Sequence, residues 1–269
     1  MMCTNWRSLI LLTLITTSVG CSTFSRHEKS GPQSSEKSPT TTVATPAQST
    51  PTTSATTDHH SPSTAAAHHE VAQGTEPEVA LRWLKNGNIR FVKHHLRKDG
   101  QSLKDVQRLA AGQKPHTIVI SCSDSRVPPE ILFDQKLGEI FVVRTAGETL
   151  DPTSLASVEY ALEHLGTKSV LVLGHTQCGA VKTACQTLNG ADAGSDNLNK
   201  LVADIHPRIA EFKNKANSKG FVDESWANVI GVSRDLTKRS KIIAEKSAAH
   251  QIKISTAVYD IETGVVNFR

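Results

Sequence analysis

Three apolar runs of strand length constrain the fold of this chain most. They span residues 116–122 (HTIVISC), 139–147 (EIFVVRTAG) and 169–176 (SVLVLGHT), and their centres are nearly continuous Val, Ile, Leu and Phe. A strand with one face in water alternates apolar and polar residues, whereas a strand covered on both faces reads as an unbroken apolar run. The runs therefore predict buried strands of a parallel sheet.

Helical patterns alternate with these runs, and they span residues 76–95, 151–166, 178–188, 196–215 and 223–249. In the second pattern Asp151 is the expected N-cap, Pro152 suits the first turn and Gly166 ends the helix. A last strand is predicted within residues 253–264. Alternating strands and helices with short connections predict an α/β fold, with a mainly parallel central sheet flanked by helices.

Composition separates this folded part from what precedes it. Residues 22–75 are rich in Ser, Thr, Pro, Ala and Gln and carry almost no large apolar side chains. Such a segment cannot bury enough surface to offset the entropy lost on ordering, so we expect a disordered tether. Residues 76–269 are long enough for one well-buried α/β domain.

Residues 1–21 have the features of an export signal. Arg7 supplies positive charge, and the apolar core at residues 9–19 has 11 residues, fewer than the ~20 of a membrane-spanning helix. The small residues before Cys21 resemble a bacterial lipobox, in which the Cys thiol is lipidated, although Ser18 stands where Leu is usual. We therefore expect a lipoprotein on the periplasmic or cell-surface side, anchored to the membrane through Cys21. An ordinary cleaved signal is the alternative.

The charge pattern excludes one class of partner. The formal net charge is +4, and the Lys and Arg residues are scattered along the chain. A nucleic-acid-binding protein would show a basic stripe or patch. We expect no nucleic-acid partner.

Potential metal ligands follow two of the predicted strands. Cys122 ends the first, His175 ends the third, and Cys178 begins the next helix. Ligand sites of open parallel sheets lie beyond the carboxyl ends of the strands, so these side chains meet if the two strands are neighbours. Two thiolates and one imidazole suit tetrahedral Zn²⁺, and three protein ligands leave one position open, as in catalytic zinc sites. Cys185 is expected to be a small buried residue of a helix.

Asp124 competes for the open position. Its carboxylate could bind the metal, or Arg126 could hold it away through a charge-assisted hydrogen bond. The Asp-x-Arg spacing therefore predicts a switch in which Asp124 either blocks the position or leaves it free for water. Which of the two is the resting state stays open.

The motifs that carry these residues, CSDSRVP and GHTQCGAV, resemble those of the β-class carbonic anhydrases. The resemblance covers residues 84–268. It implies a mainly parallel α/β fold and a homodimer or higher homo-oligomer. The activity implied for the domain at residues 76–269 is the reversible, zinc-dependent hydration of CO₂ to bicarbonate and a proton.

The resemblance also implies roles for single residues. The implied ligands of one Zn²⁺ per chain are Cys122, His175 and Cys178, with Asp124 as an occasional fourth and Arg126 as its dyad partner. The implied substrate pocket, built across a dimer interface, contains Gln113, Phe141, Ala146, Tyr160 and Gly179. Gln113 would hydrogen-bond CO₂ or bicarbonate. Ala146 stands where plant-like members often carry Val, which suggests a roomier pocket.

Two other functions fit the same motifs. Relatives of this family hydrolyse CS₂ or COS, and a narrow access route would distinguish them. A non-catalytic zinc-binding lipoprotein is the second alternative, but it would need neither the pairing of Asp124 with Arg126 nor Gln113. The proton shuttle is left unassigned, with His164 and His206 as the histidines considered.

Overall fold

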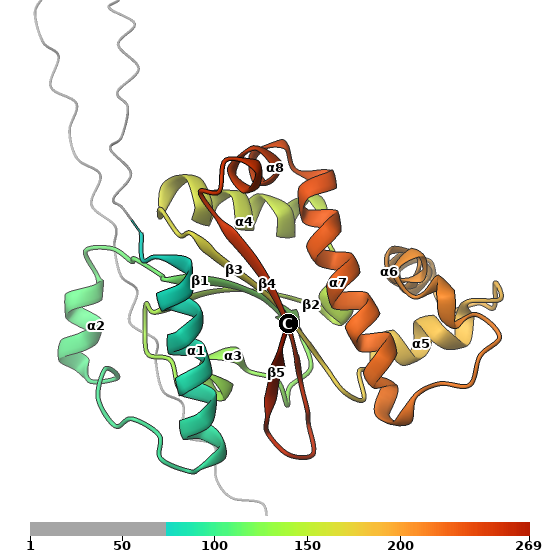
Figure 1. Ribbon diagram of the computed structural model, residues 1–269, viewed down its shortest axis with the longest axis horizontal. Coiled ribbons are helices and arrows are strands. Elements are labelled where there is room, and N and C mark those ends of the chain that lie inside the picture. Colours follow the sequence, from blue (N-terminus) through green and yellow to red (C-terminus); the bar gives the residue numbers. More distant parts are fainter. Residues whose placement is uncertain (1–73) are drawn as a thin grey trace, which may run out of the picture. The chain divides into compact units, whose positions relative to one another are not determined.

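The computed structural model describes residues 74–269 (Figure 1). The expected export signal, Cys21 and nearly all of the expected tether lie outside these residues. No helix within the described part is both long and apolar enough to cross a bilayer.

A five-stranded sheet forms the centre of the described chain. Its strands are β1 (Thr117–Cys122), β2 (Ile140–Thr145), β3 (Ser169–His175), β4 (Lys253–Tyr259) and β5 (Val266–Phe268). The order is β2-β1-β3-β4-β5, with four parallel strands and an antiparallel β5 at one edge. The predicted mainly parallel sheet is confirmed. The last predicted strand, residues 253–264, was too long, because β4 ends at Tyr259 and a tight turn at Asp260–Gly264 follows. The hairpin to β5, which lies beyond that run, was not predicted.

Helices cover the sheet and its edges. They are α1 (Pro77–Val92), α2 (Leu103–Leu109), α3 (Pro129–Leu132), α4 (Pro152–His164), α5 (Gly179–Thr187), α6 (Asp196–Ile205), α7 (Val222–Arg239) and α8 (Lys241–Ala248). Asp151 caps α4 as predicted, and its side chain accepts a hydrogen bond from the Ser154 amide. The short α2 and α3 were not predicted.

Two predicted helices were too long. The pattern at 196–215 ends as an α-helix at Ile205, and 3₁₀ turns follow from His206, with Pro207 in the first of them. The pattern at 223–249 breaks at Ser240, whose backbone is extended and whose side chain caps α8 through the Ile243 amide. Proline restricts the residue before it and lacks an N–H, and a serine cap offers the backbone an alternative to helix, so both interruptions have a local cause.

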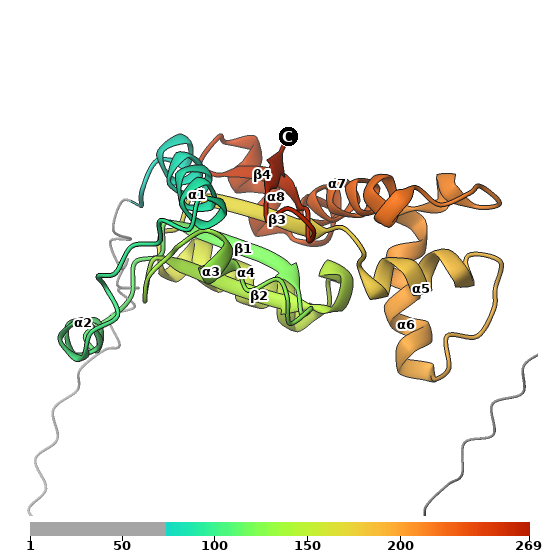
Figure 2. The same ribbon diagram turned by 90° about the horizontal axis from the view of Figure 1, so that it is seen from below.

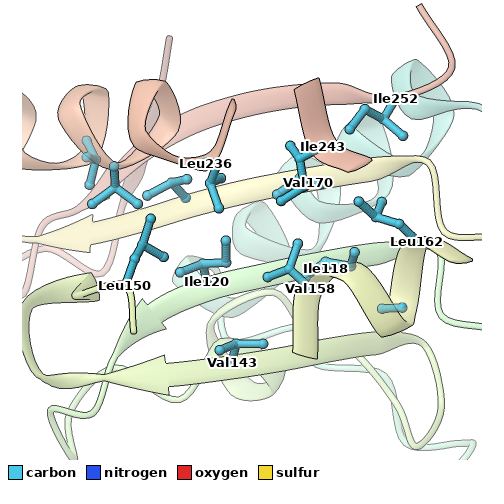
Figure 3. Close-up of a cluster of buried hydrophobic side chains, with 14 of the residues drawn as sticks. Ile118, Ile120, Val143, Leu150, Val158, Leu162, Val170, Leu236, Ile243 and Ile252 are labelled. Atoms are coloured by element: carbon cyan, nitrogen blue, oxygen red, sulfur yellow. The ribbon is translucent and has the colours of Figure 1, made fainter. Parts of the chain in front are cut away.

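Both faces of β1 and β3 are buried, as their apolar runs predicted. The same prediction was wrong for β2, because it lies at the edge of the sheet and its residues are mostly half-buried. Every residue of β1 and β3 is buried. On one face, residues of β1 and β3 pack against α4, α7 and α8, including Ile120, Val158 and Leu236 (Figure 3). On the other face, Val119 and Leu171 pack with residues of α1 and α3. Figure 1 shows α1 and α7 on opposite sides of the strands.

A smaller apolar cluster lies where α5 and α6 pack together, and its buried members are Ala184, Val202, Ile205 and Ile209. Figure 2 shows this helix pair past the end of β3. Packing against α6 fixes the position of α5, whose first turn follows the predicted ligand Cys178.

Candidate metal centre

Pairing of β1 with β3 brings the predicted ligands together. The two strands are parallel neighbours, with Ser121 opposite Leu173, so Cys122 and His175 end at the same edge of the sheet. Cys178 is the N-cap of α5. The Cys122 and Cys178 sulfurs and a His175 ring nitrogen all lie within 4.8 Å of one another, and all three residues are buried.

The donor atoms fit a tetrahedral zinc ion. The Cys122 and Cys178 Sγ atoms are 4.0 Å apart, close to the roughly 3.8 Å expected for two sulfurs that each lie about 2.3 Å from one tetrahedral zinc. His175 Nδ1 lies 2.9 Å from the Thr176 carbonyl oxygen, and its buried Nε2 has no hydrogen-bond partner within residues 74–269. A ring that donates through Nδ1 presents the Nε2 lone pair, which is the usual second-shell arrangement of a metal-binding histidine.

The pKa values of the Cys122 and Cys178 thiols are shifted in opposite directions. A hydrogen bond from the Cys178 thiol, assisted by the Gly147 amide, lowers the pKa of Cys122 well below its ordinary value. The same hydrogen bond, together with burial, raises the pKa of Cys178. The pair therefore loses its first proton readily, and a thiolate is the form of cysteine that binds metal.

Asp124 is paired with Arg126 and turned toward it. The guanidinium donates from Nε to Oδ1 at 2.9 Å and from Nη2 to Oδ2 at 2.7 Å, and the Arg126 amide also donates to Oδ1. This bidentate pairing holds the pKa of the Asp124 carboxyl well below its ordinary value. Asp124 Oδ2 still lies 4.0 Å from His175 Nε2. Of the two states of the predicted switch, the structure has the one in which Arg126 holds the carboxylate.

A second arginine, which sequence reasoning missed, fixes the backbone of this loop. Arg144 of β2 donates from Nε to the Cys122 carbonyl oxygen at 2.9 Å and from Nη2 to the Asp124 carbonyl oxygen at 2.6 Å. The one sequence signal was a charged residue inside an otherwise apolar run (VVRT).

The predicted pocket residues divide into two groups. Ala146 follows β2, whose last residue Thr145 pairs with Cys122, and Gly179 directly follows Cys178, so both lie at the metal-ligand edge. In the part of the chain that the structure describes, no heavy atom outside its chain neighbours and its own helix backbone would lie within 4 Å of a Cβ placed on Gly179, so the space beside this position is open.

Gln113, Phe141 and Tyr160 lie away from the cluster within one chain. Phe141 pairs with Ile118, four residues and about 13 Å along β1 from Cys122. Tyr160 is a half-exposed residue of α4 whose ring centre lies 6.5 Å from that of Phe141. Gln113 precedes β1 at the opposite end of the strand, where it lines a hollow of about 1170 Å³ between α1 and α2.

The surroundings of the other cysteine and of the two histidines considered from the sequence indicate structural roles. Cys185 is partly buried on α5, and burial raises the pKa of its thiol to about 11. His206 Nε2 lies 2.9 Å from Thr187 Oγ1, which joins α6 to α5. His164 is exposed beside Tyr160, with ring centres 5.0 Å apart.

The sequence around this centre is similar to known proteins. Residues 117–266 match the protein-family model described as carbonic anhydrase. Carbonic anhydrase 2 of Mycobacterium tuberculosis is 37% identical over 191 residues, which make up 71% of this chain and 91% of that protein. The carbonic anhydrase of Mycolicibacterium smegmatis is 37% identical over 196 residues, 72% of this chain and 94% of the relative.

Solved structures show the same similarity. The β-carbonic anhydrase CafA of Aspergillus fumigatus aligns with a TM-score of 0.55 at 25% identity, over 71% of this chain and 89% of that one. The Coccomyxa β-carbonic anhydrase in complex with acetazolamide aligns with a TM-score of 0.53 at 27% identity, over 60% of this chain and 75% of that one.

The geometry predicts which residues hold the metal and which cysteine does not. Cys122→Ser, His175→Ala and Cys178→Ser should each lose bound zinc, because each removes one of three converging donors. Cys185→Ser is the matched control and should keep a full complement. Elemental analysis of the purified variants checks this, and full zinc in the first three would contradict the assignment.

Proposed function

We propose zinc-dependent, reversible hydration of CO₂ for this chain, which belongs to the β-class carbonic anhydrases. The observation that carries the proposal is the convergence of Cys122, His175 and Cys178 beside an aspartate that Arg126 holds in place. Three donors with one open position suit a catalytic zinc better than a structural one.

The proposed work of the protein residues follows from their geometry. A bound zinc would supply Lewis acidity and a water activated near neutral pH. Arg126 occupies both Asp124 oxygens and keeps the carboxylate off the open position. The Asp124 carboxylate is then a fixed acceptor beside that position, suited to orient the proton of an attacking nucleophile. The Gly179 amide, at the start of α5, would offer a donor to the substrate.

The alternatives are less well supported. A zinc-storage protein has no use for a carboxylate held by a bidentate arginine. Hydrolysis of CS₂ or COS would use the same residues, so it is separated from CO₂ hydration by measurement of all three substrates.

The pairing of Asp124 with Arg126 predicts that one substitution lowers activity without loss of metal. Arg126→Ala frees Asp124 to bind the metal, so zinc content should stay full while CO₂ hydration, followed by stopped flow, falls roughly 10- to 100-fold. Arg234→Ala on the exposed face of α7 is the control and should leave the rate unchanged. Wild-type activity in Arg126→Ala would remove the switch from the mechanism. Absence of CO₂ hydration in zinc-loaded wild-type protein would overturn the proposed function itself.

We propose further that the substrate site is completed by a second copy of the chain. Gln113, Phe141 and Tyr160 lie too far from the Cys122 cluster to reach it within one chain. Large apolar side chains are exposed on α1, α2, α3 and α4 and after α3, and they include Trp83, Leu103, Val106, Ile131, Leu137 and Tyr160. A surface of this kind is typical of an interface.

Mixed dimers test this assembly. Gln113→Ala and Cys178→Ser should each be inactive alone. If Gln113 serves the partner's centre, co-expression should recover about a quarter of wild-type activity, because half of the dimers are mixed and each has one intact site. If Gln113 served its own chain, every site would carry a defect and no activity would return. That result would rule out the shared site.

We also propose export and lipidation at Cys21, on the strength of the signal-like residues 1–21. Lipid chains on Cys21 should hold the protein in the membrane fraction, because two acyl signals suffice for stable anchoring. Cys21→Ser should release it or leave an uncleaved signal. Mass spectrometry of the mature N-terminus checks the proposal, and an unmodified N-terminus at another residue would refute it without affecting the metal centre.

A further inference from the structure

The Cys122 sulfur accepts a hydrogen bond from a backbone turn that is held from outside the metal centre. The Gly147 N–H donates to Cys122 Sγ at 3.4 Å, from the 3₁₀ turn Ala146–Glu148 that follows β2. Gly147 has φ 67°, and Glu148, which is not a glycine, has φ 54°. A non-glycine residue in the left-handed region is strained and persists only where surrounding contacts impose it.

Asn228 of α7 supplies contacts that impose this conformation. Its side chain is fully buried. Its Nδ2 donates to the Gly147 carbonyl oxygen and to Glu148 Oε2, both at 2.9 Å. One amide group therefore holds both the backbone of Gly147 and the side chain of the strained residue Glu148.

Glu148 contributes a carboxyl group that the proposed reaction does not use. It is 1% exposed, and its Oε1 has no hydrogen-bond partner among the described residues. Burial, followed by the charge of the nearby Cys122 thiolate, raises the pKa of Glu148 well above its ordinary value. A buried carboxyl of this kind is costly, and Asn228 is the side chain that donates a hydrogen bond to one of its two oxygens.

A second layer of charged residues holds Asn228 and the end of the turn. Arg208 donates from Nη1 to Asn228 Oδ1 at 3.4 Å, and it also bridges Asp204 of α6 and Asp235 of α7 at 2.8 Å each. Asp204 accepts a hydrogen bond from the Leu150 amide at 3.0 Å. The turn after β2 is therefore positioned by α6 and α7 and not by its own strand alone.

We propose that Asn228 is a positioning residue for the metal centre, which keeps the Gly147 N–H on the Cys122 sulfur. The inference rests on the proposed metal centre and not on the reaction catalysed there. An N–H···S hydrogen bond withdraws electron density from a thiolate, so it tunes how strongly Cys122 donates to the metal. Without Asn228 the strained turn relaxes, and the sulfur becomes a stronger and less well-oriented donor.

Cobalt substitution tests this directly, because the sulfur-to-cobalt charge-transfer band reports the donor strength of the thiolate. In full-length Asn228→Ala this band should move to longer wavelength. Transfer of zinc from the variant to a chromogenic chelator should be roughly 10- to 100-fold faster than from wild type. Ser233→Ala removes one hydrogen bond within the same helix, from Ser233 Oγ to the Ile230 carbonyl oxygen, and should change neither.

Glu148→Gln separates hydrogen bonding from charge. A glutamine keeps an oxygen that can accept from Asn228, so its cobalt band should stay close to that of wild type. A folded Asn228→Ala protein with an unchanged band and unchanged zinc transfer would overturn the proposal, even if its melting temperature fell, because the role would then be structural alone. Failure of the wild-type protein to bind cobalt would instead contradict the proposed metal centre.

Wild-type protein loaded with a magnetically active cadmium isotope gives a test that needs no variant. A hydrogen bond to a metal-bound sulfur transmits scalar coupling, so the Gly147 amide proton should couple to cadmium through Cys122. Absence of that coupling in a spectrum that shows the cysteine β-protons coupled to cadmium would overturn the proposal.

Discussion

The parallel pairing of β1 with β3 is the constraint on which the rest of the structure depends. It places Cys122 and His175, which are 53 positions apart in the chain, at one edge of the sheet. Parallel strands need helical crossovers, and these crossovers bury both strand faces and direct the ligand-bearing loops to the carboxyl ends. The same pairing thus builds the apolar core and brings the three donors of the candidate metal centre together.

Hydrogen bonds fix the polar groups around this edge of the sheet. Arg126 holds the Asp124 side chain, Arg144 holds the backbone on either side of it, and the Gly147 amide contacts the Cys122 sulfur. Arg126 lies in the same loop as Asp124, whereas Arg144 and Gly147 come from β2 and the turn after it, and most of these contacts are charge-assisted hydrogen bonds, which are stronger than neutral ones. Such a shell explains how short loops, which are usually mobile, can hold donors at the spacing that a metal requires.

A single chain holds the metal donors and the dyad but separates them from Gln113, Phe141 and Tyr160. That division has a simple physical cause. Phe141 lies near the amino end of β2, Tyr160 packs on it from α4, and Gln113 precedes β1. These side chains cannot reach the carboxyl ends of the strands, because each residue advances a strand by about 3.3 Å. The apolar side chains exposed on α1 to α4 are consistent with a partner surface on the side where these residues lie.

Local patterns in the sequence were sufficient for several features. The burial of β1 and β3, the cap at Asp151 and the Asp124–Arg126 pairing could all be predicted, because each depends on neighbouring residues or on apolar periodicity. The breaks at Pro207 and Ser240 and the β5 hairpin were missed, since they depend on how a locally plausible helix or strand competes with a cap or a turn. Only the tertiary structure decided which strands are neighbours, and only it could show Arg144 bonded to the Cys122 carbonyl and Asn228 bonded to the turn that contacts Cys122. Neither residue lies in a recognisable motif, and each makes hydrogen bonds whose partners the fold alone brings within reach.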